Sequence, residues 1–155
     1  MVIWLNGPFG VGKTTVSQHL VQRIAGSRVV DPERIGFVIK RTFWRGADYQ
    51  DVGLWRRLTV RQIARRSRDG TVIVPMTVVD RAVFDEITSG AQVFALVASR
   101  QALEERIATS GEAEAWRRQQ LDRCLAAFAG DTLGRRIATD GRSAAEVTDS
   151  ILQQL

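Results

Sequence analysis

A glycine-rich loop near the start of the chain constrains its fold more than any other feature. Residues 7–14 read GPFGVGKT and match G-x-x-x-x-G-K-[ST] without a mismatch. The preceding run VIWL, residues 2–5, has the length and apolar content of a buried parallel strand. A segment with helical apolar periodicity follows the loop. The order of strand, glycine loop and helix therefore predicts a phosphate-binding P-loop.

Each residue type in this loop suits phosphate binding. Glycines at positions 7, 10 and 12 permit positive φ angles and a close approach of the backbone, because they have no Cβ. Lys13 would reach the β- and γ-phosphates, the Thr14 hydroxyl would hold Mg²⁺, and Thr15 would add a contact on the α-phosphate side. The N–H groups expected to face phosphate oxygens belong to Gly10, Val11, Gly12, Lys13, Thr14 and Thr15. An accidental glycine turn is the alternative, and the presence of only two lysines in the chain argues against it.

Length and composition set the broad class of protein. A chain of 155 residues with 45% hydrophobic content is most simply one globular domain, spanning residues 1–155. No run approaches the ~20 apolar residues that a membrane span needs. We expect no signal peptide, because no basic region precedes the first apolar run. The single cysteine, Cys124, cannot form an internal disulfide, so a reduced, cytoplasmic setting is expected.

The net charge of +5 depends almost wholly on arginine. A basic balance can indicate a nucleic-acid partner, but most of these arginines are scattered along the chain. One cluster consists of Arg56, Arg57, Arg61, Arg65, Arg66 and Arg68. Its spacing places several guanidinium groups on one helix face, which is either a solvated face or a contact for an anionic partner.

Apolar periodicity predicts that strands and helices alternate along the chain. Strands are expected at residues 2–5, 28–31, 71–76, 92–98 and 136–139. Helices are expected at residues 13–24, 33–43, 54–67, 80–87, 99–108, 114–128 and 143–152. Strands joined by helical crossovers form a parallel sheet with helices on both faces. The predicted fold is thus α/β, a three-layer P-loop NTPase with a five-stranded parallel sheet.

Ligands of such sheets bind beyond the carboxyl ends of the strands, where two acids follow the second strand. Asp31 could orient or deprotonate an attacking hydroxyl, or help to hold Mg²⁺, and Glu33 could share either task. The alternative is an Asp-Pro turn in which Asp31 caps the next helix. Asp80 comes late for a metal ligand after the strand TVIVPM, so it is predicted to be a helix N-cap. The Mg²⁺ shell would then depend on Thr14, Asp31 and water.

Arginines near the loop would stabilise charge on a transferring phosphoryl group. The candidates are Arg106, Arg117, Arg118 and Arg123. The polar break TSGEAEA between them predicts a short lid over ATP at about residues 109–118. Surface salt bridges to Glu104, Glu105 or Asp122 are the alternative for each arginine.

The other distinctive side chains have structural interpretations. His19 is not expected to be catalytic, and Cys124 lies among apolar neighbours and is expected to pack. Trp44, Trp55 and Trp116 could line an acceptor pocket or cover the core.

The chain resembles P-loop kinases of the nucleoside-monophosphate and shikimate kinase type, and more closely the tunicamycin-resistance protein family. The similar stretches are IWLNGPFGVGKTT, VVDPERIGFVIKR, LWRRL, VIVPMTVVDRAVFDEI, LVASRQALEERI, WRRQQLDRC and IATDGRSAAEV. The resemblance implies ATP binding and a role in resistance to the nucleotide-sugar antibiotic tunicamycin. It also implies that Asp31 lies near the acceptor, Arg106 near the phosphates, and the loop with Gly141 and Arg142 at the adenine. The residues assigned to acceptor binding are Asp31, Glu33, Phe37, Arg41, Met76 and Arg123.

Two departures from these families affect the expectation. The lid usually carries a second arginine four residues after the first, where this chain has Ser110, so Arg117 or Arg118 would have to compensate. The chain also ends at Leu155 without the C-terminal extension that is associated with membrane attachment in the resistance protein. Membrane binding is therefore not expected.

Three functions follow from these observations. The first is a kinase that transfers the γ-phosphoryl group of ATP, with Mg²⁺, to a hydroxyl of tunicamycin or a related small molecule. The second is a nucleotide-dependent protein that sequesters the drug unchanged, which the missing lid arginine and strand-end acid favour. The third is a nucleic-acid-associated NTPase, and the lack of a basic groove with interleaved aromatic residues argues against it. The sequence does not indicate an oligomeric state.

Overall fold

Five parallel strands form one sheet in the order β2-β3-β1-β4-β5. The computed structural model describes residues 1–33, 50, 52–109, 114–130 and 133–155. The strands are β1 (Val2–Asn6), β2 (Arg28–Val29), β3 (Val72–Pro75), β4 (Gln92–Val97) and β5 (Arg135–Ala138). This topology confirms the predicted five-stranded parallel sheet and places the loop after β1 in the middle of the carboxyl edge.

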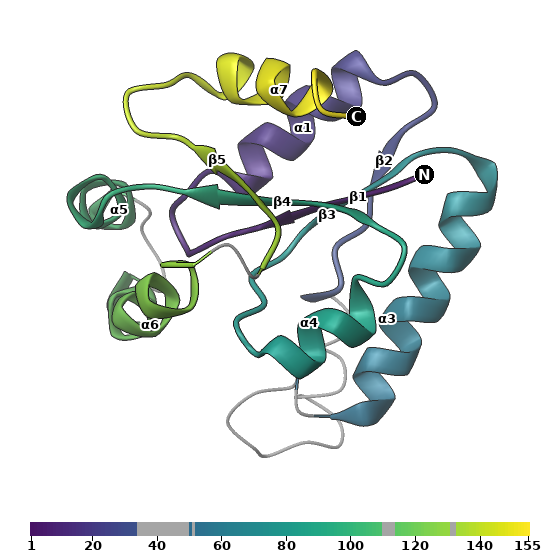
Figure 1. The fold of residues 1–155 in the computed structure, drawn as a ribbon, viewed down its shortest axis with the longest axis horizontal. Coiled ribbons are helices and arrows are strands. Elements are labelled where there is room, and N and C mark those ends of the chain that lie inside the picture. Colours follow the sequence, from purple (N-terminus) through teal and green to yellow (C-terminus); the bar gives the residue numbers. More distant parts are fainter. Residues whose placement is uncertain (34–49, 51, 110–113, 131–132) are drawn as a thin grey trace.

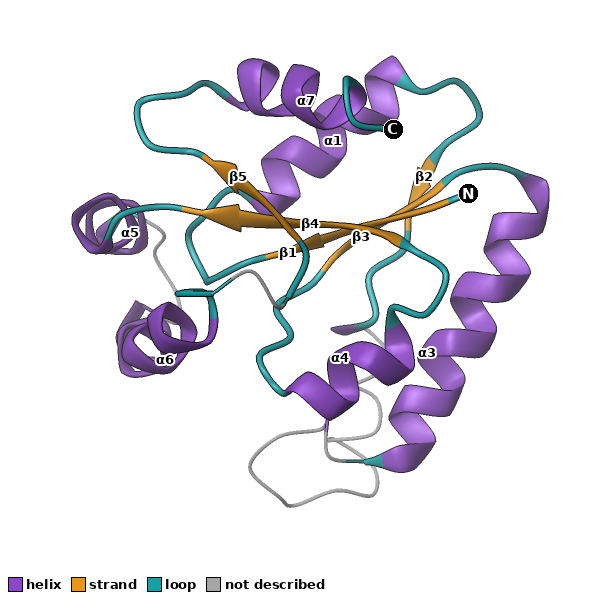
Figure 2. Ribbon diagram, viewed as in Figure 1, coloured by secondary structure: helices purple, strands orange, loops and turns teal. Residues whose placement is uncertain are grey.

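Helices cover both faces of the sheet, as the three-layer prediction requires (Figures 1 and 2). The helices are α1 (Lys13–Arg23), α3 (Gly53–Arg66), α4 (Arg81–Ile87), α5 (Arg100–Ala108), α6 (Glu114–Ala127) and α7 (Ala144–Leu152), with a 3₁₀ turn η2 (Ser67–Asp69). In Figure 1, α1 and α7 lie above the sheet and α3 and α4 below it, while α5 and α6 lie beside its carboxyl edge. No helix within the described ranges is long and apolar enough to cross a membrane.

The strands are apolar throughout because both of their faces are buried. Successive side chains of β1 alternate between two hydrophobic clusters. Ile3 and Leu5 pack with residues of α1, α5 and α7, whereas Trp4 packs with residues of α3 and α4. All three are fully buried. The core therefore holds the carboxyl end of β1, and the loop that follows it, from both sides.

The five strands differ from their predicted bounds by one or two residues at one or both ends. β2 ends at Val29 rather than at residue 31, because Pro32 has no N–H and the Asp31 carboxylate accepts a hydrogen bond from the Glu33 N–H instead. β5 begins one residue earlier than expected, at Arg135. The helix predicted over residues 33–43 lies outside the described residues, except for Glu33.

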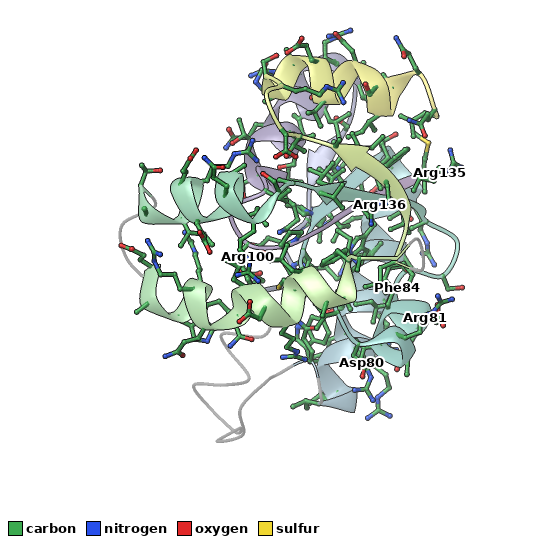
Figure 3. The ribbon with its side chains drawn as sticks, turned by 60° about the vertical axis from the view of Figure 1, so that its left-hand side comes forward. Asp80, Arg81, Phe84, Arg100, Arg135 and Arg136 are labelled. Atoms are coloured by element: carbon green, nitrogen blue, oxygen red, sulfur yellow. The ribbon has the colours of Figure 1, made fainter. Side chains whose placement is uncertain are left out.

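The predicted helix caps are confirmed. Asp80 accepts a hydrogen bond from the Val83 N–H at 2.9 Å and begins α4, where Figure 3 shows it beside Arg81 and Phe84. Ser99 caps α5. Ser143 forms a capping box with Glu146 at the start of α7. These caps fix the starts of three helices that follow strands at the carboxyl edge.

Candidate active site

Asn6, the last residue of β1, holds the start of the glycine loop in place. Its side chain is fully buried, and its Oδ1 accepts hydrogen bonds from the N–H groups of Gly7 at 3.0 Å and Val78 at 2.9 Å. Its Nδ2 donates to the carbonyl oxygens of Val78 at 3.0 Å and Leu133 at 3.4 Å. Asn6 thus joins the loop to the segments that follow β3 and precede β5. The sequence analysis missed it, although a polar residue that ends an apolar strand was the available signal.

The glycines give the loop its shape. Gly7 has a φ of +136°, and a Cβ at this position would lie 2.3 Å from the carbonyl oxygen of Leu96, so no other residue fits. Gly12 has a φ of +99°, and no atom lies within 4 Å of the position that its Cβ would occupy. The backbone at Gly12 therefore faces open space, as a cradle for phosphate requires.

The first turn of α1 supplies free donors to this cradle. Gly12 is the N-cap and offers no side-chain cap, so the N–H groups of Lys13, Thr14 and Thr15 have no helical partner. The side chains of Thr14 and Thr15 are exposed. Within the loop, the Val11 N–H donates to the Pro8 carbonyl at 3.4 Å. The unsatisfied N–H groups and the helix dipole together form an anion site that fits a nucleotide phosphate chain.

Lys13 occupies the mouth of the loop. Its ammonium donates to the carbonyl oxygens of Gly7 and Pro8, both at 2.8 Å, and lies 5.6 Å from the centre of the Phe9 ring. Burial lowers the pKa of Lys13 to about 8. The lysine is therefore held over the loop, where an incoming phosphate would meet it.

Thr77 stands near the end of β3, where P-loop proteins commonly carry an acid. Its buried hydroxyl donates to the Gly7 carbonyl oxygen at 2.8 Å, so that this oxygen accepts from Thr77 and Lys13 together. No group of three His, Cys, Asp or Glu side chains that could hold a metal occurs in the described part of the chain. A Mg²⁺ ion would accordingly depend on the exposed Thr14 hydroxyl, one carboxylate such as Asp31, phosphate oxygens and water. No role was predicted for Thr77 from the sequence, although it lies in the stretch VIVPMTVVDRAVFDEI that carries the family resemblance.

Asp31 and Glu33 lie on the β2 side of the loop. Asp31 Oδ1 accepts from the Glu33 N–H at 2.9 Å, which is the capping turn considered above, and its second oxygen has no partner among the described residues. Burial, and next the nearby Asp31 carboxylate, raise the pKa of Glu33, while Lys13 and Arg117 partly offset this rise. Glu33 therefore lies within electrostatic reach of Asp31, Lys13 and Arg117.

Arg106 lies on the opposite side, in the last turn of α5. Its guanidinium donates to the hydroxyl and the carbonyl oxygen of Thr139, both at 3.0 Å. Its Cβ is 3.7 Å from the position that a Cβ of Gly10 would occupy. Hydrogen bonds from Ser99, with a smaller contribution from Arg106, lower the pKa of Asp140. Arg106 thus links the glycine loop to the turn after β5, where Gly141 has a φ of +64°.

The side chain of Arg142 extends to the end of β5 and to the helix that follows, α7. Its guanidinium donates to the carbonyl oxygens of Ala138 at 3.0 Å and Glu146 at 2.7 Å, and to the Ser150 hydroxyl. The expected contact of Arg142 with adenine would therefore have to come from its backbone.

Two other residues considered for the acceptor site, Met76 and Trp55, lie in the core. Met76 is fully buried, and its expected role in acceptor binding stays a prediction. Trp55 is also fully buried, and its indole N–H donates to the Pro32 carbonyl at 3.1 Å. Cys124 is buried and packs, and burial raises the pKa of its thiol. The residues Phe37, Arg41, Trp44 and Ser110 lie outside the described part.

The remaining arginines divide between salt bridges and free positions. Arg118 pairs with Glu114, and Arg100 extends from α5 toward α6 to pair with Asp122 (Figure 3). Arg123 is exposed on α6 and forms no ion pair with a described residue. On α3, Arg56 pairs with Glu86 at 2.7 Å, and the other arginines of that helix are exposed on the outer face. Of the predicted lid, residues 110–113 lie outside the described part and residues 114–118 begin α6.

Comparison with known proteins agrees with this geometry. A protein-family model described as an AAA domain matches residues 2–130. The structure of the tunicamycin resistance protein of Deinococcus radiodurans is similar to this chain, with a TM-score of 0.81 and 31% identity, covering 99% of this chain and 94% of that one. No curated protein sequence matches the chain significantly.

Two more distant structures share the fold. A gluconokinase from Sinorhizobium meliloti has a TM-score of 0.72 and 18% identity, covering 98% of this chain and 89% of that one. A shikimate kinase from Acinetobacter baumannii has a TM-score of 0.64 and 19% identity, covering 99% of this chain and 91% of that one.

Proposed function

The chain belongs to the AAA-domain family of P-loop, kinase-like proteins, and on that basis we propose that it transfers the γ-phosphoryl group of ATP to a hydroxyl of tunicamycin or a related nucleotide-like molecule. One observation carries this proposal. The Glu33 carboxylate lies within electrostatic reach of Asp31, Lys13 and Arg117, and Lys13 donates to the Gly7 and Pro8 carbonyl oxygens of an open P-loop.

The nucleotide half of the reaction is supported by the loop and by α5. The N–H groups at the start of α1 would bind the phosphates, with Lys13 turning from its two carbonyl partners to the β- and γ-phosphates. Arg106 would bind near the phosphates, and the turn at residues 140–142 near the adenine. When bound, Mg²⁺ would neutralise phosphate charge, and Thr14 and Asp31 would be its protein ligands.

The acceptor half is supported by the acids at the end of β2. The free oxygen of Asp31 would accept the proton of the attacking hydroxyl as the new oxygen–phosphorus bond forms and the bond from the γ-phosphorus to ADP breaks. Lys13 and Arg117 would offset the negative charge on the transferring group. Arg117 would thereby compensate for the lid arginine that this chain lacks. Because the reaction consumes ATP, we place the protein in the cytoplasm, where it would give resistance to the antibiotic.

Sequestration of the drug without chemistry is the second candidate. One observation favours it, since a threonine, Thr77, stands where P-loop proteins commonly carry a metal-binding acid. Such a protein would bind tunicamycin in a nucleotide-dependent way and release it unchanged.

Mass spectrometry of tunicamycin incubated with the protein, ATP and Mg²⁺ separates the two. The kinase proposal expects the drug to gain the mass of one phosphoryl group with the wild-type protein and not with Lys13→Ala. Arg118→Ala, which removes an exposed arginine paired with Glu114, is the matched control and should retain the activity. A drug that binds but keeps its mass supports sequestration. A drug that neither binds nor changes contradicts both candidates.

A further inference from the structure

Trp116 is exposed where a residue of its kind is normally buried. It retains 50% of its surface, and it is the only aromatic residue among the large exposed hydrophobic side chains of the described ranges. It lies in the first turns of α6, in which Leu121 and Cys124 are buried and Leu125 is partly buried. An exposed indole offers a flat apolar face with one polar N–H, which suits contact with a ring.

The Trp116 ring is fixed to the glycine loop. Its centre lies 4.9 Å from that of Phe9 at an interplanar angle of 66°, an edge-to-face contact. Phe9 in turn lies 5.6 Å from the Lys13 ammonium. The indole is therefore held at the mouth of the site, beside the lysine that would meet the γ-phosphate.

These aromatic rings lie on the acceptor side of the loop. Phe9 packs against the hydrophobic cluster on the α3 and α4 face of the sheet, which includes Val30 and Trp55 as well as Cys124 of α6. The next residue, Gly10, instead faces Arg106 and Ile107 of α5, on the nucleotide side. Lys13, which lies beside Phe9, and Arg117, which follows Trp116 in α6, both act on the Glu33 carboxylate, so the aromatic pair lies near the region of Asp31 and Glu33.

The charges of this region favour an uncharged acceptor. Asp31 and Glu33 lie close enough for Asp31 to raise the pKa of Glu33, and neither forms an ion pair with a described residue. The two cations that act on Glu33, Lys13 and Arg117, would face the phosphates once ATP is bound, and the two neighbouring carboxylates would then repel an acceptor that carries its own carboxylate. They accept hydrogen bonds from hydroxyl groups, which a sugar ring or a ribose supplies.

We propose that Phe9 and Trp116 form the aromatic wall of the acceptor site and, with Asp31 and Glu33, select an uncharged acceptor that combines a flat ring face with hydroxyl groups. A nucleoside would stack its base on the wall, and a sugar would place its apolar ring face there. This assignment rests on the proposed function because it names the acceptor class of that same site.

Equilibrium binding tests the proposal without requiring turnover. Calorimetric titrations would use uridine, glucose, tunicamycin, shikimate and gluconate, each with the protein saturated by a non-hydrolysable ATP analogue and Mg²⁺. We expect uridine or glucose, and tunicamycin, to bind more tightly than the two carboxylates. Tighter binding of uridine than of glucose would identify base stacking, and the reverse would identify a sugar face.

The variants Trp116→Ala and Trp116→Phe distinguish a role of Trp116 in acceptor binding from a purely structural role in packing over the glycine loop. Trp116→Ala should weaken acceptor binding at least tenfold and change the affinity for the ATP analogue less than twofold. Trp116→Phe should stay within about threefold of the wild-type protein, because it keeps a ring. Val60→Ala, which shortens an exposed apolar side chain on α3, is the matched control and should change neither affinity.

Several results would overturn the proposal. These are unchanged acceptor binding by Trp116→Ala, an equal loss of nucleotide binding, tighter binding of shikimate or gluconate, or no binding of any uncharged probe by the wild-type protein. Phosphoryl transfer is measured separately. If acceptor binding depends on Trp116 and no phosphoryl transfer is detected, the result contradicts the proposed kinase activity and supports the proposed aromatic wall.

Discussion

The two sides of the glycine loop differ in how their polar groups are satisfied. On the nucleotide side, Arg106 is bonded to Thr139, and Asp140 accepts from the Ser99 N–H. On the acceptor side, Asp31 and Glu33 lie close together without an ion pair to any residue that the structure describes. The nucleotide side is thus already organised by its own contacts, whereas the acceptor side keeps charges that a substrate would satisfy. Changes on the two sides should therefore affect different steps.

The largest effect is expected from Asp31→Asn. The amide oxygen can still accept from the Glu33 N–H, but the group can no longer take a proton, and general-base catalysis contributes about 10²- to 10⁴-fold. Turnover should fall by at least 100-fold (~10² from that range), with nucleotide affinity within about twofold. Steady-state kinetics and calorimetry measure the two quantities. Full turnover by this variant would remove Asp31 from the chemistry.

Arg106→Ala should have its effect on the nucleotide side. Loss of a charged group that bonds Thr139 twice and lies beside the loop should weaken ATP binding on the order of 30-fold, or about 2 kcal/mol. The KM for the acceptor should change little. Arg118→Ala, which loses only an exposed pair, is the control. A rise in the acceptor KM as large as the loss of ATP affinity would break the distinction between the two sides.

Nucleotide affinity should fall at alkaline pH. Because the pKa of Lys13 is about 8, the charged fraction of this lysine falls by up to about tenfold between pH 7 and pH 9, and ATP affinity should follow it. Lys13→Arg stays charged and should lose this dependence. Calorimetric titration of the ATP analogue at pH 7, 8 and 9 measures the effect, and a flat profile for the wild-type protein would contradict it.

Stability should change with pH in the opposite direction. Between about pH 8 and pH 10.5 the unfolded chain holds the Lys13 proton more tightly than the folded protein does. This lysine therefore makes unfolding less favourable as the pH rises through that window, and its penalty to the folded state is complete below pH 8. The difference in unfolding free energy between the wild-type protein and Lys13→Met, measured by denaturant titration, should shrink over this range. A constant difference would contradict the lowered pKa.

The smallest effect is expected from Thr77→Val. The variant removes one of the two donors to the Gly7 carbonyl and keeps the side-chain shape, so ATP binding should weaken about fivefold, or ~1 kcal/mol. Thr77→Ser should restore the affinity because it restores the hydroxyl. Equal affinity for all three proteins would show that Lys13 alone suffices for this oxygen.

Local sequence patterns predicted most of the fold, because the elements that they mark depend on neighbouring residues. The glycine loop, the five strands and the caps at Asp80, Ser99 and Ser143 follow from spacing and from residue type. Asn6 and Thr77 were missed because their partners lie about 70 residues away along the chain. Such contacts depend on strand register, which no local pattern gives.

The direction of side chains also could not be predicted from the sequence. The arginine-rich sequence indicated cations near the loop, but only the tertiary structure distinguishes Arg117, which acts on Glu33, from Arg142, which is bonded to the end of β5 and to α7. Trp55 and Trp116 show the same limit. Both received the same two interpretations from the sequence, but Trp55 lies in the core and Trp116 is exposed at the surface.

The shared Gly7 carbonyl has a consequence for how the site exchanges nucleotide. The Lys13 ammonium donates to the Gly7 and Pro8 carbonyl oxygens at the mouth of the loop. When the lysine rotates toward a phosphate, the Thr77 hydroxyl remains on the Gly7 oxygen, so no buried acceptor is stranded. Loading and unloading then require the rotation of one side chain rather than the rebuilding of the loop, and the backbone can keep one conformation throughout the cycle.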